Sequence, residues 1–399
     1  TDGDGDFTFS RNSAATRVNA QGLVENVQIL SSNLVQNGDF SEIGEEEVTN
    51  GSFSEEGSEL VTNGDFATDS DWTKGTGWSI SGGSANCDGT QTSNSNLLQS
   101  NTATSGNTYK ITYTITNYVS GTFKSVLGVG GVVRNSNGVY SEYITATSSS
   151  FLLQANSDFI GSIDNVSVKE VGQDWTIENT WTIGNSVANG NGANGGSEEI
   201  IQNSVLVVGK EYKATYQVLN YVSGSVALWK GSGVSLIQRT ANNTYTEYFT
   251  GASNQIRFRG TNFIGSITNI SVKEVGQDWN LSTGWSIGDD IINFSNPTGT
   301  ELYQALSTTI GKYKIKFDLN ITNGTCQTSF TSPGTSTIEN FTTNGTKEVI
   351  IETTSNYSRF RFVGIGNSDF TITNISVLEI TDDTDLPRIN YEGFSYQDV

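Results

Sequence analysis

The sequence predicts an all-β protein built from three copies of one two-sheet module. Three observations support this fold class. The composition is rich in Thr, Ser, Asn, Gly, Val and Ile, with only 3 Pro among 399 residues, which favours short strands and tight turns. Pairs of tryptophans recur at intervals the size of a domain. Each repeat also contains segments in which apolar and polar residues alternate, the pattern of a half-buried strand.

The tryptophan pairs define the repeat. The two members of each pair are six residues apart, and the pairs recur with a period of 103 to 104 residues. The pairs are Trp72 with Trp78, Trp175 with Trp181, and Trp279 with Trp285. A period of this length indicates a domain-sized unit rather than a solenoid turn. Tryptophans that recur beside Gly and Ile are more typical of core anchors than of ligand contacts.

Each unit also has two recognisable strands. The first follows the tryptophan pair and alternates, as in Tyr109, Ile111, Tyr113 and Ile115. The unit ends with a matched closing strand at residues 161–168, 265–272 or 367–377. With the segments between them, these strands indicate a two-sheet sandwich or jelly roll in each module.

A shorter repeat precedes the modules. Residues 34–40, 48–53 and 60–66 each contain Asn-Gly-Asp-Phe or Asn-Gly-Ser-Phe, and their Asn residues follow one another every 13 residues. Only the third copy directly precedes a module. A jelly roll without its first strand would expose an unpaired edge, so we expect the other two copies to complete modules 2 and 3 as strands.

This reasoning predicts nested modules. The expected boundaries are 58–171 for module 1, 45–57 with 172–276 for module 2, and 34–44 with 277–380 for module 3. A base element formed by 1–33 with 381–399 would contain both chain ends. Chain termini that lie close together make such insertions tolerable.

Composition excludes several classes of function. The net charge of −21 repels nucleic-acid phosphate and anionic lipid, so we expect neither as a partner. No apolar run approaches the roughly 20 residues of a membrane helix, so no membrane insertion is expected. The chain has no His, which rules out a Ser-His-Asp triad and imidazole metal sites. Because the acidic residues gather in the polar stretches 42–59 and 382–385, we expect no enzyme. Cys87 and Cys326 fall in different repeats, so we expect two isolated thiols.

The module motifs resemble a known family. The Val-x-Asn-Gly-Asp-Phe segment, the Gly-Trp that follows it and the closing Ile-Asp-Asn-Val resemble the jelly-roll carbohydrate-binding modules attached to xylanases and laminarinases. That resemblance implies a structural calcium ion near the first and last strands. The acidic position after the Phe is Ser or Ala in all three copies, and the closing Asp is kept only as Asp164. We therefore expect no cofactor other than calcium, and calcium only in module 1, at Asp65 and Asp164.

The two chain ends give a second resemblance. Residues 7–18, Phe-Thr-Phe-Ser-Arg-Asn-Ser-Ala-Ala-Thr-Arg-Val, with Gly-Leu-Val-Glu at 22–25, are similar to a motif of phage tail-fibre and head-spike proteins. The second half of that motif matches Pro-Arg-Ile-Asn-Tyr at 387–391. The resemblance implies a virion-surface, extracellular location and other virion proteins as partners. It also implies a homotrimer as one expected assembly, since such fibres are often trimers.

Five residues are candidates for contacts with glycans. Trp229 has no Trp counterpart in modules 1 and 3, and Tyr118 and Tyr221 lie in an Asn-Tyr-Val-Ser-Gly turn shared by modules 1 and 2. Arg257 and Arg259 flank a Phe on a strand. They could line a sugar or acidic-glycan groove or pair with carboxylates across strands. Trp229 could equally serve packing.

Taken together, these features favour a non-catalytic virion appendage or fibre protein that binds glycans of a host surface. Two alternatives stay open. One is a secreted bacterial adhesin or an array of carbohydrate-binding modules. The other is a structural capsid or tail decoration protein without a ligand.

Overall fold

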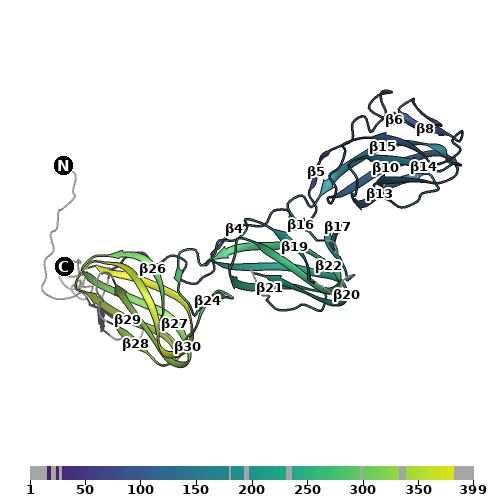
Figure 1. The fold of residues 1–399 in the computed structure, drawn as a ribbon. Coiled ribbons are helices and arrows are strands. Elements are labelled where there is room, and N and C mark those ends of the chain that lie inside the picture. Colours follow the sequence, from purple (N-terminus) through teal and green to yellow (C-terminus); the bar gives the residue numbers. More distant parts are fainter. Residues whose placement is uncertain are drawn as a thin grey trace, which may run out of the picture. The chain divides into compact units, whose positions relative to one another are not determined.

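The computed structural model describes residues 16–18, 24–26, 29–178, 181–192, 197–230, 236–296, 300–331 and 338–381. Every regular element in this part of the chain is a β-strand, so the predicted fold class is confirmed (Figure 1). Accordingly, the described residues include no helix that could cross a membrane. The contacts divide the chain into two compact units: residues 45–273, and residues 1–44 with 274–399.

Module 1 has two antiparallel sheets that enclose one hydrophobic core. The first sheet has the order β13-β10-β15-β8-β7, with β5 also paired to β15, and the second has the order β12-β11-β14-β9-β6. The strands are β5 (Glu56–Glu59), β6 (Thr73–Lys74), β7 (Trp78–Ser81), β8 (Ser84–Asp88), β9 (Ser95–Gln99), β10 (Thr108–Ser120), β11 (Phe123–Leu127), β12 (Val129–Gly130), β13 (Gly138–Thr145), β14 (Phe151–Ala155) and β15 (Ile160–Val171).

Module 2 repeats this pattern with longer strands. Here β20 corresponds to β10 and β11 of module 1, and β22 corresponds to β14 and β15. The order is β16-β19-β22-β18-β17, with β20 paired to β21 and β22, and β4 paired to β22. The strands are β4 (Ile43–Glu46), β16 (Thr176–Ile177), β17 (Trp181–Gly184), β18 (Val187–Asn191), β19 (Ser197–Gln202), β20 (Glu211–Trp229), β21 (Asn243–Thr250) and β22 (Ile256–Val275).

Module 3 has the same organisation in the other unit. The order is β23-β26-β30-β25-β24, while β27 pairs with β28, β29 and β30. The strands are β23 (Asn280–Leu281), β24 (Trp285–Gly288), β25 (Ile291–Asn296), β26 (Glu301–Thr308), β27 (Gly311–Thr331), β28 (Glu339–Phe341), β29 (Gly345–Thr353) and β30 (Tyr357–Thr381).

The alternating segments identified in the sequence supply much of each core. In module 1, the side chains of Tyr109, Ile111, Tyr113 and Ile115 on β10 are fully or almost fully buried, as are their counterparts on β20 and β27. Their interleaved neighbours are partly exposed. The period-two pattern therefore gives the correct inward face of these strands.

The Asn-Gly-Asp-Phe segments are turns, so their prediction as strands was wrong. The Asn and the Phe of each copy have positive φ angles, for example 50° at Asn50 and 53° at Phe53, which lie outside the β region, and none of the three segments belongs to a strand. The turn approaches the closing strand very closely. A Cβ at Gly51 would lie 1.9 Å from the carbonyl oxygen of Ile270, so only glycine fits here.

Each turn inserts its Phe beneath a tryptophan. The ring centroids of Phe53 and Trp175 are 5.3 Å apart, and the indole Nε1 of Trp175 donates to the carbonyl oxygen of Asn50 at 3.2 Å. Module 1 has the same arrangement at Phe66 and Trp72, and module 3 has it at Phe40 and Trp279. The segment 48–53 thus packs in the core that contains Trp175, although its nearest module in sequence is module 1.

The strands that enter each module are fixed to the closing strand by one side chain. In module 1, Glu59 Oε1 accepts from the backbone N–H of Val61 and of Val168, while Ser167 Oγ donates to Oε2. Glu46 makes the same contacts in module 2. In module 3, the Oδ1 of Asn33 accepts from Val35 and Val377.

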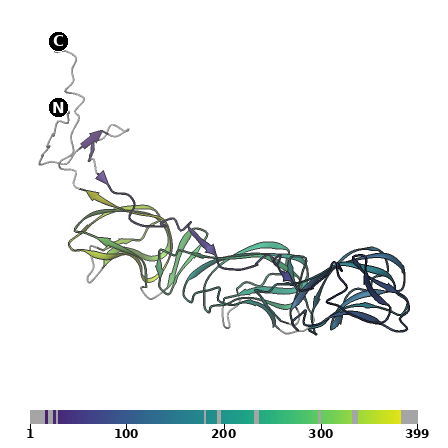
Figure 2. The same ribbon diagram turned by 90° about the horizontal axis from the view of Figure 1, so that it is seen from above.

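The base element is described only in part. Strands β1 (Thr16–Val18) and β2 (Val24–Asn26) form an antiparallel pair. Strand β3 (Ile29–Leu30) pairs with the end of β30, where the purple and yellow strands lie side by side in Figure 2. The second half of the split motif, at 387–391, lies outside the described residues. The base element and the domain boundaries given above stay predictions.

Replacing the buried Phe of one turn at a time tests which module each turn stabilises. Replacing Phe53 by Ala should destabilise module 2 by about 3–5 kcal/mol, because it leaves a cavity beneath Trp175. Hydrogen exchange followed by mass spectrometry should therefore accelerate in residues 172–272 and stay unchanged in 72–168. Phe66→Ala is the reciprocal control and should affect 72–168 alone. Faster exchange of module 1 in the Phe53→Ala protein would contradict nesting.

Candidate functional site

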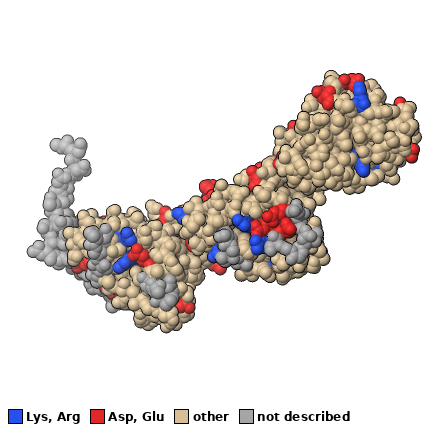
Figure 3. Space-filling view, in the orientation of Figure 1, with Lys and Arg blue, Asp and Glu red and all other residues tan. Residues whose placement is uncertain are grey.

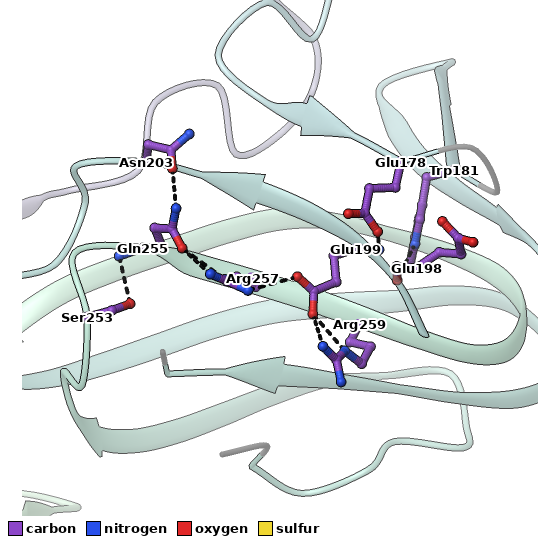
Figure 4. Close-up of polar contacts among 9 residues, drawn as sticks. All are labelled: Glu178, Trp181, Glu198, Glu199, Asn203, Ser253, Gln255, Arg257 and Arg259. Carbon is purple, nitrogen blue, oxygen red and sulfur yellow. Dashed lines mark hydrogen bonds and ion pairs between the residues drawn. The ribbon is translucent and has the colours of Figure 1, made fainter. Parts of the chain in front are cut away.

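The candidate site lies on the outer face of one sheet of module 2, where β19, β22 and the end of β20 meet. Side chains alternate along β22: Ile256 and Phe258 are fully buried, while Arg257 and Arg259 point to the outer face (Figure 4). The strand period thus places both arginines on the same side of the sheet, with their Cα atoms about 7 Å apart along the strand.

A single carboxylate holds the two arginines. Glu199 on β19 lies directly opposite Arg259 in the strand register. Its Oε1 accepts from Arg259 Nε at 2.7 Å and also contacts Nη2, and its Oε2 accepts from Arg257 Nη1 at 3.2 Å (Figure 4). The side chain of Glu199 is only 5% exposed, against 26% and 27% for the two arginines. The carboxylate is therefore covered, and the guanidinium groups remain accessible.

Trp229 completes the cluster. It is the last residue of β20 and its ring is half-buried. The guanidinium carbon of Arg259 lies 3.7 Å from the ring centroid, a cation–π contact. Because Glu199 fixes Arg259 from one side and Trp229 stacks on it from another, the guanidinium plane has little rotational freedom. The Trp229–Arg259–Glu199–Arg257 group is called the module 2 cluster below.

Polar residues extend the cluster along the strand. Arg257 Nε donates to Gln255 Oε1 at 3.0 Å, and Gln255 Nε2 donates to Asn203 Oδ1 at 2.6 Å. On the other side, Glu178 accepts the backbone N–H of Glu199 at 2.8 Å (Figure 4). Figure 3 shows basic and acidic atoms gathered in small groups on the visible face, whereas most of that surface is uncharged.

The two candidate tyrosines lie elsewhere and have a structural role. The hydroxyl of Tyr221 donates to the carbonyl of Gly224 at 3.0 Å, and that of Tyr118 donates to Gly121 at the same distance. Both rings pack at the edge of a core, Tyr221 beside Phe263 and Tyr118 beside Phe159. Neither hydroxyl bonds to a residue of the module 2 cluster, and a glycan contact of the two tyrosines stays a prediction.

Each of the two candidate calcium ligands bonds to a backbone N–H close to it in the sequence. Asp65 Oδ1 accepts the backbone N–H of Ala67, and Asp164 Oδ1 accepts that of Asn165 at 2.6 Å. Within the described ranges, no three acidic or Cys side chains gather as a metal site would require. Neighbouring carbonyls could add ligands, so calcium in module 1 stays a prediction.

The repeated tryptophans are core anchors, as expected. All six are at most 7% exposed. In modules 2 and 3, the second Trp of each pair donates its indole N–H to a backbone carbonyl, as Trp181 does to Glu198 at 3.1 Å. Their rings are thus unavailable for stacking on a ligand, whereas the ring of Trp229 is only half-buried.

A buried polar cluster was missed by sequence reasoning. In module 2, Glu247 accepts from the Tyr216 hydroxyl at 2.6 Å and from Arg239 at 3.0 and 3.1 Å. Burial, and then the neighbouring carboxylate, raise the pKa of Tyr216, so its hydroxyl stays a donor at ordinary pH. Module 1 repeats the cluster with Tyr113, Glu142 and Arg134. The sequence signal that could have revealed this cluster is an acidic residue at an inward position of a strand, Glu247 on β21 and Glu142 on β13.

This cluster fastens a loop to the sheet. Arg239 also bridges to Val226 through paired backbone hydrogen bonds and stacks on Tyr245. It therefore fastens the segment before β21 to the sheet. Module 3 has Phe317 and Val349 at the corresponding positions, where Val349 pairs with Ile315. An apolar pair can thus replace the polar one without loss of the fold.

Stability measurements should separate Trp229 from the core tryptophans. Trp229→Ala removes a half-buried ring and one cation–π contact, so the free energy of unfolding should fall by about 1 kcal/mol or less. Trp175→Ala opens a core cavity and should cost about 3–5 kcal/mol. Both values follow from urea unfolding monitored by circular dichroism. Equal losses for the two variants would make Trp229 a core residue.

Comparisons with known proteins give no family assignment. No protein-family model matches the sequence, and no curated protein matches it. Among solved structures, the chain is similar to the CBM22-1-CBM22-2 tandem domain of Xyn10C from Paenibacillus barcinonensis, with 10% identity, 55% of this chain and 98% of that chain covered, and a TM-score of 0.23. It is also similar to allantoicase from Saccharomyces cerevisiae, with 6% identity, coverage of 46% and 78%, and a TM-score of 0.21. A third similar chain belongs to Sulfolobus Turreted Icosahedral Virus, with 14% identity, coverage of 78% and 90%, and a TM-score of 0.20. Because these scores are low, the fold assignment rests on the strands and sheets described above.

Proposed function

We propose that this chain is a non-catalytic surface protein of a virion, part of an appendage or fibre, and that module 2 binds a glycan through the module 2 cluster. The location is supported by the resemblance of residues 7–18 to phage tail-fibre and head-spike proteins. The binding role is supported by one observation above all. Trp229 stacks on a guanidinium that Glu199 already holds in place, on an outer sheet face.

This arrangement suits a sugar ring. The half-buried indole can offer apolar surface to the C–H face of a pyranose, as aromatic rings do for other flat apolar partners. The guanidinium groups donate hydrogen bonds in a fixed fork, which suits adjacent hydroxyls of a saccharide. Because Arg257 and Arg259 are already ordered by Glu199, binding would immobilise few side chains and would cost less entropy.

The charges favour a neutral glycan. Both oxygens of Glu199 are already paired with the two arginines, and a second carboxylate, that of Glu178, accepts the backbone N–H of Glu199. An anionic sugar would have to compete with Glu199 for these donors. It would also approach a chain with a net charge of −21, which repels anions at long range.

The corresponding face of module 1 has a different character. The positions of Arg257, Arg259 and Glu199 are taken there by Leu152, Gln154 and Asn96, judged by the strand register. Module 1 therefore folds without the two arginines and the carboxylate, and the charged residue beside Gln154 on this face is Lys124 of β11. The module 2 cluster is not required to build the module, which favours a binding role over a purely structural one.

A glycan array should detect the proposed activity. The labelled chain should bind a subset of neutral glycans, and Trp229→Ala should reduce these signals at least tenfold. Tyr248→Ala is the matched control, because it removes an aromatic ring stacked on a cation, Lys213, elsewhere in the same module, and it should leave binding unchanged. A folded protein that binds no glycan would support the decoration protein, and equal effects of both variants would exclude a role for Trp229.

We also expect no hydrolysis of bound polysaccharides. The chain has no His, and glycoside hydrolysis needs two carboxyl groups that face each other across a cleft. Glu199 is neutralised by two arginines, and Glu247 is buried against Tyr216 and Arg239. Incubation with a broad polysaccharide panel should release no reducing ends above a heat-denatured control. Release from any substrate would contradict the non-catalytic assignment.

A further inference from the structure

Module 3 carries a second cluster of the same chemistry. Arg359 and Arg361 flank the buried Phe360 on β30, as Arg257 and Arg259 flank Phe258 on β22. Glu301 on β26 bridges the two arginines, at 2.9 Å from Arg359 Nη1 and 3.1 Å from Arg361 Nη1. An aromatic ring is again stacked on one guanidinium. Here it is Tyr303, whose ring centroid lies 4.5 Å from the guanidinium carbon of Arg359.

The two clusters share two positions and differ in the other two. Gln202 and Gln304 bond in the same way to the segment that enters each module, and Glu199 and Glu301 each lie three residues before them on the strand. The second arginine differs, because Arg259 lies opposite Glu199 whereas Arg359 lies opposite Ala305. The ring comes from β20 in module 2 and from β26 in module 3. In module 1 the position of the carboxylate is held by Asn96.

The change in the second arginine and in the ring argues against inherited packing. If the cluster only stabilised the sheet, equivalent positions would be expected to do equivalent work in each module. Instead the same set of groups is completed from different positions in modules 2 and 3, and module 1 folds without the set. We propose that the face of module 3 formed by Tyr303, Arg359, Glu301 and Arg361 is a second saccharide site, an inference that rests on the proposed glycan binding of module 2.

The two sites should differ in what they can contact. The side chain of Glu301 is 25% exposed and that of Arg359 is 39% exposed, whereas Glu199 is only 5% exposed. In module 3 the carboxylate can therefore accept hydrogen bonds from a ligand as well as from the arginines. Arg361 is fixed from behind, because its Nε donates to the Oγ of the fully buried Ser329 at 3.1 Å.

A neutral saccharide with vicinal hydroxyls fits this geometry. One hydroxyl can donate to Glu301 while its neighbour accepts from Arg359, and the half-buried ring of Tyr303 can contact the C–H face of the sugar. In module 2 the covered Glu199 is less accessible to a ligand than the donors of Arg257 and Arg259. We therefore expect the two sites to select overlapping but different sets of neutral glycans.

The test uses the full chain on an array of neutral and acidic glycans. Tyr303→Ala and Arg359→Ala should each lower a set of neutral signals at least tenfold and leave the glycans lost in Trp229→Ala largely unaffected. The protein with both Trp229→Ala and Tyr303→Ala should bind none. Lys314→Ala is the matched control, because it removes the ion pair with Glu348 where β27 pairs with β29, outside the cluster, and it should change nothing.

The outcomes separate the two proposals. If Trp229→Ala abolishes all binding and the Tyr303 and Arg359 variants bind like the unmodified chain, the second site is wrong and the first stands. If only the module 3 variants lose binding, the second site stands and the role of Trp229 is wrong. Binding confined to acidic glycans would overturn the assignment to neutral saccharides. Circular dichroism of each variant shows that a lost signal is not a lost fold.

Discussion

The contact between one Phe and one Trp in each module is the constraint on which the architecture depends. The indole N–H that closes this contact reaches an Asn carbonyl 9 residues away in module 1, 125 away in module 2 and 242 away in module 3. The same local geometry is thus made across very different lengths of chain. Loop-closure entropy rises only with the logarithm of loop length, so a long insertion costs little more than a short one. A folded insert has, in addition, already lost most of its freedom.

The entering strands turn this contact into a defined path for the chain. Glu59 and Glu46 each accept two backbone N–H groups and one serine hydroxyl, and so tie the segment before the turn to the closing strand of the same module. Asn33 does the same for the backbone groups of module 3. Hydrogen bonds from backbone N–H groups to an ionised carboxylate are stronger than those between neutral groups. The chain therefore enters and leaves each of these modules along one closing strand.

Much of the fold could be predicted from the sequence because period and repetition are local properties. The alternation at Tyr109 to Ile115 gives the inward face, and the tryptophan pairs give the modules. The Asn-Gly-Asp-Phe segments were mistaken for strands because their apolar residues resemble a strand start, while the positive φ of the Asn and the Phe is a property of the folded turn. The site was predictable only in part. Trp229 and Arg259 could be named, but their contact depends on the pairing of β20 with β22, and the bridging Glu199 lies on a third strand.

The interior and the outer face of the modules are under different physical constraints. Inward positions hold Phe, Trp and Tyr whose loss would open cavities costing several kcal/mol, so the three cores keep the same anchors. Substitutions at outward positions on a strand usually change stability by about 0.5 kcal/mol or less, so one register position can hold Asn96 in module 1 and Glu199 or Glu301 in the other two, and a neighbouring one can hold Ile201 or Tyr303. A repeated module is therefore free to acquire, move or lose a polar cluster on this face without refolding. The fold determines where on the module a binding site can form. The outward side chains of each copy determine whether that copy has such a site.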